Sequence, residues 1–215
     1  MSQTKPKPRG AKNPRLKIGF TDEQKEAHRL FHQYDVNFIN GRYGTGKTLS
    51  AVGIAILGIR KKQFEKIWIT RPILKNKLGF LPGDLESKTA PWVFPIIHNF
   101  NQCQVAATTQ KMLDTQQVEI KPIDFVKGVT FVNSVVIVDE YEDLEYSEFK
   151  LLLSRLGKHS KIIFCGDPDQ TDSSIKDPCF PHIKKLKDSG LVGWNTLEIN
   201  HRNDSLADIF EYLEH

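Results

Sequence analysis

One short segment of the chain has the residue types and spacing of a phosphate-binding loop. Residues 41–48 read Gly-Arg-Tyr-Gly-Thr-Gly-Lys-Thr and match the pattern GxxxxGK[ST] at every fixed position. Glycines let the backbone turn sharply, so that successive N–H groups point at one anion, and the first turn of a following helix adds unpaired donors. Lys47 would reach the β- and γ-phosphates of a nucleoside triphosphate, and the Thr48 hydroxyl would bind Mg²⁺. The predicted nucleotide-contacting residues of this loop are Gly41, Tyr43, Gly44, Thr45, Gly46, Lys47, Thr48 and Leu49.

Two acidic residues follow the apolar stretch 135–138. An acid at the carboxyl end of a strand beside the phosphate loop would hold Mg²⁺ through its water shell, and we predict this role for Asp139. Glu140 would polarise the water that attacks the γ-phosphate. Because residues 139–148 contain six acids, the alternative interpretation is that both residues simply begin an acidic surface.

A third polar segment, Gly-Asp-Pro-Asp-Gln at 166–170, follows the apolar stretch 161–165. Gln170 would stand near the γ-phosphate and report its loss through a hydrogen bond to the phosphate or to the attacking water. The alternative is an ordinary turn after a strand, in which Gly, Asp and Pro are common.

These segments require a framework in which strands and helices alternate. A capping box at residues 21–24 predicts a helix through about Tyr34, and hydrophobic patterning predicts the other elements. The predicted strands cover residues 36–40, 66–70, 118–120, 135–138, 161–165 and about 194–199. The predicted helices cover residues 47–61, parts of 91–117, 145–156, about 180–189 and about 204 onwards, with a long loop at 71–90. This alternation predicts an α/β fold with a mostly parallel sheet and helices on both faces.

Length and composition exclude several classes of protein. The chain has 215 residues, which suffices for one sizeable core, and we expect a single domain over residues 20–213. No apolar run approaches the length needed to cross a bilayer, so we expect no membrane partner. The three cysteines have neither zinc-ligand spacing nor the density of a disulfide scaffold, which favours a reducing, cytoplasmic setting.

The formal net charge of +4 is concentrated at one end of the chain. The first 17 residues contain six basic residues and no acid, so the rest of the chain carries a net charge of −2. Because this segment is also rich in Pro and poor in apolar residues, we expect residues 1–19 to form a disordered basic arm. The arm would serve either as an electrostatic contact for nucleic acid or only as a solvating terminus.

Six short motifs occur in a fixed order along the chain: GRYGTGKT, ITRP, LGFLPGDLE, GVTFVNSVVIVDE, SRLG and GDPDQ. This order resembles the PhoH-like ATPases of bacteria and phages, and the similarity runs from about Phe20 to about Leu213. The resemblance implies a single RecA-like P-loop core related to superfamily 1 helicase motors. One departure is Glu142, because the family usually has glutamine at this position.

The resemblance also implies roles for residues outside the phosphate loop. Gln24 lies where such motors use a glutamine to read adenine, although it also completes the capping box. Thr70 and Arg71 resemble a strand-end motif that contacts the nucleic-acid backbone or relays the nucleotide state, with a solvated loop as the alternative. Arg202 resembles the helicase arginine that stabilises transition-state charge at the γ-phosphate. Arg155 is a rival for that role, and a surface salt bridge is the alternative for either arginine.

Two-domain helicases carry that arginine on a second motor domain, for which this chain has no room. We therefore expect subunits to pair head to tail into a homo-oligomeric ring, a hexamer being one size, with Arg202 or Arg155 acting in trans. The predicted function is Mg²⁺-dependent ATP hydrolysis coupled to binding or unwinding of single-stranded RNA or DNA. The main alternative is an ATP-dependent switch that regulates a protein partner. A nucleic-acid-binding module with a vestigial nucleotide site and a small-molecule kinase are two further alternatives.

Overall fold

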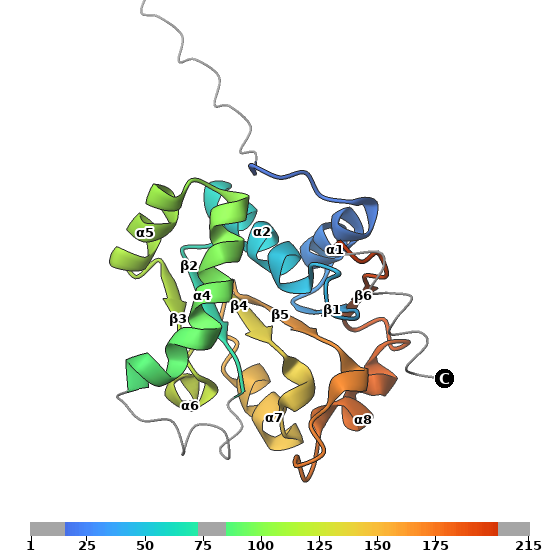
Figure 1. Cartoon of the computed structure of the whole chain (residues 1–215). Coiled ribbons are helices and arrows are strands. Elements are labelled where there is room, and N and C mark those ends of the chain that lie inside the picture. Colours follow the sequence, from blue (N-terminus) through green and yellow to red (C-terminus); the bar gives the residue numbers. More distant parts are fainter. Residues whose placement is uncertain (1–15, 73–84, 202–215) are drawn as a thin grey trace, which may run out of the picture.

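The computed structural model describes residues 16–72 and 85–201, which contain a six-stranded sheet in the order β3-β2-β4-β5-β1-β6 (Figure 1). All neighbouring strands in it are parallel, so each connection must cross over to return to the same edge. The predicted α/β fold with a parallel sheet is confirmed. The strands are β1 (Val36–Asn40), β2 (Lys66–Thr70), β3 (Val118–Ile120), β4 (Ser134–Asp139), β5 (Lys161–Gly166) and β6 (Gly193–Thr196).

Helices cover both faces of the sheet (Figure 1). The first layer contains α1 (Asp22–Gln33), α2 (Lys47–Arg60), α4 (Leu85–Cys103) and α5 (Ala106–Asp114). The second layer contains α6 (Ile123–Val126), α7 (Tyr146–Ser154) and α8 (Cys179–Ile183). In neither described stretch does any helix have the length and apolarity required to span a membrane.

Strand β4 explains why the chain forms two cores, one on each face. All six of its residues are buried, and successive side chains of a strand point to opposite faces. Val135 and Ile137 join the core cluster beneath the first helical layer, whereas Val136 and Val138 join the cluster beneath the second. A strand that is covered on both faces needs an unbroken apolar run, and residues 135–138 supply it.

Some element boundaries differ from the sequence predictions. The predicted loop 71–90 is wrong for residues 85–90, because α4 already begins at Leu85. Two prolines inside α4 make its sequence resemble a loop, but Ile96 and Phe100 are buried in the first core cluster and hold the helix in place. The last strand ends at Thr196 rather than at 199, and the predicted helix 180–189 is shortened to α8 followed by a 3₁₀ turn.

The segment before α1 is attached to the core rather than extending from it. Leu16 and Ile18 pack against the first core cluster, and the Lys17 N–H donates to the Cys103 carbonyl over 2.8 Å. Residues 16–19 therefore differ from the predicted disordered arm, because their apolar side chains find a packing partner. Residues 1–15 of that arm, residues 73–84 of the predicted loop and the predicted helix from about 204 lie outside the described residues.

Candidate functional site

The parallel sheet brings the three polar segments of the sequence to one edge. Strand β5 lies between β4 and β1 in the sheet, and parallel strands all end at the same edge. In the register of the sheet, Asp139 lies opposite Cys165, and Asn40 lies opposite Gly166. The phosphate loop after β1, the acidic segment after β4 and the 166–170 segment after β5 are therefore neighbours at the carboxyl edge.

The phosphate loop has the backbone that the glycines predict. Gly44 and Gly46 have φ values of +80° and +82°, which residues with a Cβ rarely adopt. A Cβ on Gly46 would lie 3.1 Å from the side-chain nitrogen of Gln24, so that the Gln24 side chain would have to shift by a few tenths of an ångström. Helix α2 begins at Lys47, and no side chain caps its first turn. Its first N–H groups are therefore donors available to an anion.

Two side chains of the loop, Lys47 and Thr48, make hydrogen bonds at the carboxyl edge. The Lys47 ammonium group donates to the carbonyls of Gly41 and Arg42, the latter over 3.0 Å. The Thr48 hydroxyl donates to the Asp139 carboxylate over 2.7 Å. This contact joins the first turn of α2 to the end of β4, so that a hydroxyl and a carboxylate lie side by side below the loop.

The chemistry of the Thr48–Asp139 pair fits Mg²⁺. Both side chains offer oxygen, the ligand type that Mg²⁺ prefers, and Mg²⁺ commonly takes only one or two protein ligands because it keeps waters and phosphate oxygens. Within residues 16–72 and 85–201, no cluster of three His, Cys, Asp or Glu side chains is arranged to hold a metal ion. Burial raises the pKa of Asp139, while the Thr48 hydrogen bond and the charges of Arg71 and Lys47 oppose this shift.

Glu140 lies at the same edge with an unusual backbone and a charged partner. Its φ and ψ are 52° and 51°, in the left-handed region, where a residue with a side chain is uncommon. The Arg71 guanidinium forms an ion pair with its carboxylate. Burial raises the pKa of Glu140, the charge of Arg71 lowers it, and the neighbouring acids Asp139 and Asp143 raise it further.

Gln170 and Gln24 both line the cavity that the phosphate loop borders. The Gln170 side-chain nitrogen donates to the Asp167 carboxylate over 2.8 Å. The Gln24 side-chain oxygen accepts from the Thr21 N–H over 3.1 Å, which confirms the capping box. The capping role of Gln24 therefore coexists with a position beside the loop, and its predicted contact with adenine stays a prediction.

The cavity has a volume of about 610 Å³, within the range of sites for small molecules. Sequence reasoning missed several of its lining residues, because they come from elements that only tertiary packing brings to the loop. The polar pair His98 and Gln102, one helical turn apart with side chains 2.7 Å from each other, was a local signal on α4. The missed lining residues are Ile18, Gly19, Thr21, His98, Asn99, Gln102, Glu142 and His201.

Glu142, the departure from the family pattern, is a buried acid in the wall of this cavity. Only 6% of it is exposed, and one of its carboxylate oxygens has no hydrogen-bond partner. That oxygen packs directly against Gly166, where any side chain would collide with it. Burial, with smaller contributions from Glu140 and Asp143, raises the pKa of Glu142 to about 8. At neutral pH the group is therefore mostly an uncharged carboxylic acid, which is close to glutamine in shape and polarity.

The remaining predicted residues, Thr70, Arg155 and Arg202, differ in how they relate to the cavity. Thr70 is fully buried at the end of β2, and its hydroxyl has no hydrogen-bond partner. Arg202 lies outside the described residues, but the preceding His201 donates its N–H to the Gly44 carbonyl over 3.0 Å. Arg155 follows α7 at the opposite edge of the sheet, where its carbonyl accepts from the Phe131 N–H. The structure thus pairs Arg71 with Glu140, which lines the cavity, and leaves Arg155 away from it.

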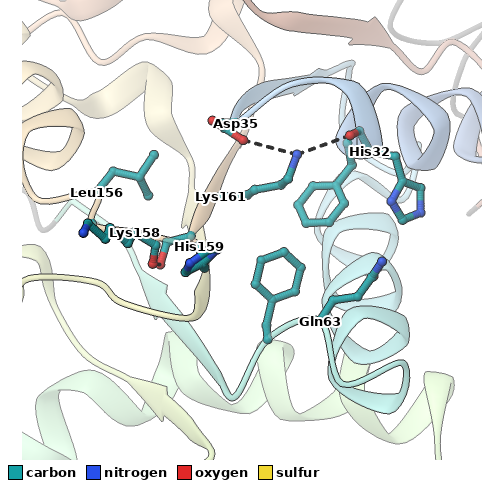
Figure 2. Close-up of a pocket in the computed structure, with 11 residues that line it drawn as sticks. His32, Asp35, Gln63, Leu156, Lys158, His159 and Lys161 are labelled. Carbon is teal, nitrogen blue, oxygen red and sulfur yellow. Dashed lines mark hydrogen bonds and ion pairs between the residues drawn. The ribbon is translucent and has the colours of Figure 1, made fainter.

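A second cavity, of about 560 Å³, lies at the amino edge of the sheet (Figure 2). Lys161 projects into it from the start of β5 and donates to the Tyr34 carbonyl over 2.9 Å. The same ammonium group lies 3.3 Å from the Asp35 carboxylate. Phe31 and Phe64 form an apolar wall of the cavity. Lys161 donates to backbone carbonyls at the end of α1. The cavity at the amino edge therefore meets the end of a helix, whereas the phosphate loop leads into the start of one.

Comparisons with known proteins give relatives for most of the chain. The sequence profile of the family described as "PhoH-like protein" matches residues 18–203. A PhoH-like protein of Bacillus subtilis is 33% identical over 196 residues, which cover 87% of this chain and 61% of the relative. Protein PhoH of Escherichia coli K12 is 36% identical over 139 residues, which cover 63% of this chain and 39% of the relative. The chain therefore spans only part of the length of these relatives.

A solved structure gives the fold comparison. The SWI2/SNF2 ATPase core of Sulfolobus solfataricus, in complex with dsDNA, matches with a TM-score of 0.50 and 11% identity, over 86% of this chain and 46% of that one. At this identity the likeness concerns the fold alone, which is that of a RecA-like P-loop core. The family profile covers nearly all of the described residues and the motifs that line the carboxyl-edge cavity, and the chain belongs to the PhoH-like protein family.

Proposed function

We propose that this protein hydrolyses ATP in a Mg²⁺-dependent reaction that is coupled to single-stranded RNA or DNA. The observation that carries the proposal is the hydrogen bond from Thr48 to Asp139, directly below the open first turn of α2. This contact joins the phosphate loop to the acidic strand end, and together these would form the two halves of a nucleotide-hydrolysing site. A site that only bound phosphate would not need the second half.

Different residues would bind the phosphates, the Mg²⁺ ion and the adenine of Mg-ATP. The N–H groups of the phosphate loop and of the first turn of α2 would bind the phosphates, and Lys47 would move from the loop carbonyls to the β- and γ-phosphate oxygens. Thr48 and Asp139 would hold Mg²⁺, which neutralises charge on the phosphates when bound. The Gln24 amide would face the adenine, and the α4 residues His98 and Gln102 would close the opposite wall of the cavity.

Hydrolysis requires a water molecule in line with the bond that breaks. The Glu140 carboxylate accepts the water proton while the water oxygen bonds to the γ-phosphorus. The bond between that phosphorus and the bridging oxygen breaks at the same time, and ADP leaves with the bonding electron pair. The proton then passes from Glu140 to inorganic phosphate or to solvent. Gln170, whose amide donates to the Asp167 carboxylate, would respond when the γ-phosphate departs.

A head-to-tail ring would complete the site with an arginine from a neighbour. Arg155 follows α7 at the amino edge, so it would reach a nucleotide only in the next subunit. Arg202 follows His201, which contacts the phosphate loop of its own subunit. Arg202 itself lies outside the described residues, so its action in trans stays a prediction, whereas Arg155 would act only in such a ring. All three cysteines are buried free thiols, which supports a cytoplasmic location.

The deciding experiment measures phosphate release by the purified protein with Mg-ATP, alone and with single-stranded RNA or DNA. The mass of the oligomer is measured in the same buffer. We expect Mg²⁺-dependent hydrolysis that nucleic acid stimulates, a stimulation that weakens steeply with salt, and a mass above that of a monomer. ATP binding without phosphate release would favour the regulatory switch that acts on a protein partner. A monomer that hydrolyses ATP at full rate with nucleic acid present would rule out the ring.

A further inference from the structure

The ion pair between Arg71 and Glu140 joins the ends of two neighbouring strands. Strand β2 ends at Thr70 and β4 ends at Asp139, and Thr70 lies opposite Val138 in the parallel register. The two partners therefore belong to the loops that leave adjacent strands at the carboxyl edge. One loop carries the residue that would activate water, and the other carries the only guanidinium paired with it among the described residues.

We infer that Arg71 holds the Glu140 carboxylate in an unproductive position, and that a nucleic-acid phosphate releases Glu140 by taking over the Arg71 guanidinium. Arg71 is then a positioning residue that makes hydrolysis depend on the polynucleotide. This inference rests on the proposed function. A carboxylate that is engaged by a charged donor is a weaker acceptor for the proton of a water molecule, so the pair suppresses hydrolysis while it lasts.

The Arg71 and Glu140 side chains can separate and bind other groups without any unfolding of the sheet. Exposed fractions are 30% for the Arg71 side chain and 39% for the Glu140 side chain, so solvent and a phosphate reach the pair. The Arg71 backbone is fixed, because its carbonyl accepts from the Ile123 N–H over 3.3 Å. The guanidinium is therefore the part that can move. Its planar fork binds phosphate with the same two-pronged geometry that it uses for carboxylate.

The backbone of Glu140 is fixed as well, so only its side chain can respond. Its left-handed φ leads into a 3₁₀ turn over Tyr141–Asp143, and its carbonyl accepts from the Asp143 N–H over 3.1 Å. Lys47 is the other nearby cation, and Asp139 and Asp143 are the nearby acids. Glu140 already lines the cavity. Once the guanidinium is withdrawn, Asp139 and Asp143 repel the carboxylate and Lys47 attracts it, so that it turns toward Lys47, where the attacking water would stand.

A binding experiment without nucleotide tests the coupling directly. Fluorescence anisotropy measures the affinity of a labelled oligouridylate of about 12 nucleotides for four proteins: the wild type, Arg71→Gln, Glu140→Gln and the double variant. Glu140→Gln removes the competing charge, so we expect it to bind several-fold more tightly than the wild type. Arg71→Gln should bind several-fold more weakly, with a salt slope smaller by about 0.7 to 1. The double variant should bind like Arg71→Gln, because there is no longer a guanidinium to release.

Turnover of ATP gives the second readout. We expect Arg71→Gln to raise the rate without oligonucleotide several-fold and to lose most of the stimulation by oligouridylate. Arg71→Lys keeps the charge but not the fork, so it should recover part of the stimulation. Arg29→Gln is the matched control, since Arg29 also pairs with a glutamate, Glu26, but on an exposed face of α1. This control should leave oligonucleotide affinity and stimulation unchanged.

Several results would overturn the inference. Equal affinities of Glu140→Gln and wild type, or effects of the two substitutions that simply add, would mean that Glu140 does not compete for the guanidinium. A lower basal rate in Arg71→Gln would mean that Arg71 places Glu140 productively. In both cases a wild type that binds and responds to oligouridylate leaves the proposed function intact. A wild type that hydrolyses ATP but neither binds nor responds to the oligonucleotide would remove the nucleic-acid part of the proposed function, and the inference with it.

Discussion

Cavities of similar volume lie at the two edges of the sheet, about 610 Å³ at the carboxyl edge and about 560 Å³ at the amino edge. A lysine in each donates to backbone carbonyls, Lys47 in the first and Lys161 in the second (Figure 2). The two edges differ in which end of a helix they meet. Helix α2 begins at the carboxyl edge and offers N–H groups, whereas α1 ends at the amino edge and offers carbonyls. Helix starts favour anions and helix ends favour cations.

The comparison teaches that helix polarity, more than cavity size or the presence of a lysine, distinguishes the proposed phosphate site from the cavity at the amino edge. At the amino edge, the cation that the end of α1 attracts is Lys161 itself, which the Asp35 carboxylate also engages. At the carboxyl edge, the anion that the start of α2 attracts has to come from a ligand. Lys47 is therefore predicted to serve ligand binding and Lys161 to serve stability, so the two lysines can be compared in the same experiments.

Substitution of Lys47 should have the largest effect. Lys47→Ala removes the cation that faces the phosphates, so we expect hydrolysis to fall by about 10²-fold or more and the affinity for a fluorescent ATP analogue to fall strongly. Titration with the analogue and phosphate-release kinetics measure both quantities. Lys161→Ala is the control and should bind the analogue like the wild type. Equal losses of analogue affinity in the two variants would contradict the prediction that only the carboxyl edge binds the nucleotide.

Glu140→Gln should separate binding from chemistry at the carboxyl edge. The amide keeps the size of the side chain but cannot take a proton, so we expect turnover to fall by about 10² to 10⁴-fold while ATP remains bound. Single-turnover phosphate release and analogue titration give the two values. If phosphate release stays normal, Glu140 is not the general base.

The pH dependence of stability should reveal the buried acid at the carboxyl edge. The pKa of Glu142 is about 8 in the folded protein, against an ordinary value of 4.5. Between these two pH values the folded state therefore holds a proton that the unfolded state has already lost. The contribution of Glu142 to stability is therefore present below pH 4.5 and is lost as pH rises to about 8, by at most about 1.4 kcal/mol per pH unit. Glu142→Gln should flatten this dependence in urea unfolding from pH 5 to 8. Glu65→Gln, at an exposed position, should leave the dependence as it is.

At the amino edge, Lys161→Ala should lower stability without changing function. The substitution leaves the carbonyls at the end of α1 without their charged donor, and hydrogen bonds to charged groups contribute about 1.5 to 3 kcal/mol. Because the Lys161 side chain is 19% exposed and water can replace it in part, we expect the lower end of that range. Thermal and urea unfolding measure the change. An unchanged melting temperature would mean that Lys161 does not hold the end of α1.

A pH response of the opposite sign is expected on α1. Burial first, then the charges of His32 and Lys61, lower the pKa of His28 to about 4. The unfolded chain therefore takes up a proton between pH 6.5 and about 4 that the folded chain does not, and stability falls as pH falls through this window. His28→Gln should weaken this acid-side loss in urea unfolding. A loss that is identical in the variant would exclude His28 as its source.

The phosphate loop, Asp139, Glu140 and Gln170 could be placed from the sequence for one physical reason. Each follows a strand that is visible as an apolar run, and parallel strands bring their carboxyl ends together. The long, buried α2 behind the loop was visible in the same way. Local patterns therefore sufficed wherever a residue's position depends only on the strand that precedes it.

Other parts of the site depend on contacts between distant segments and left no local signal. Arg71 and Glu140 are 69 positions apart, and neither sequence context indicates that they meet. The neutral state of Glu142 arises from its burial against Gly166, which no residue pattern near 142 reveals. The start of α4 was missed because Pro91 lowers the helix propensity of a segment that core packing nevertheless holds helical.

The alternation of side chains in β4 restricts how this chain can change in length. Val135 and Ile137 belong to one core, and Val136 and Val138 belong to the other. The loss or gain of one residue within the strand would exchange the two sets and would turn Asp139 away from Thr48. Point substitutions between apolar residues are compatible with this strand, whereas single-residue deletions and insertions are not. Length variation among functional variants should therefore fall in the connections, and the spacing from Val135 to Asp139 should stay constant.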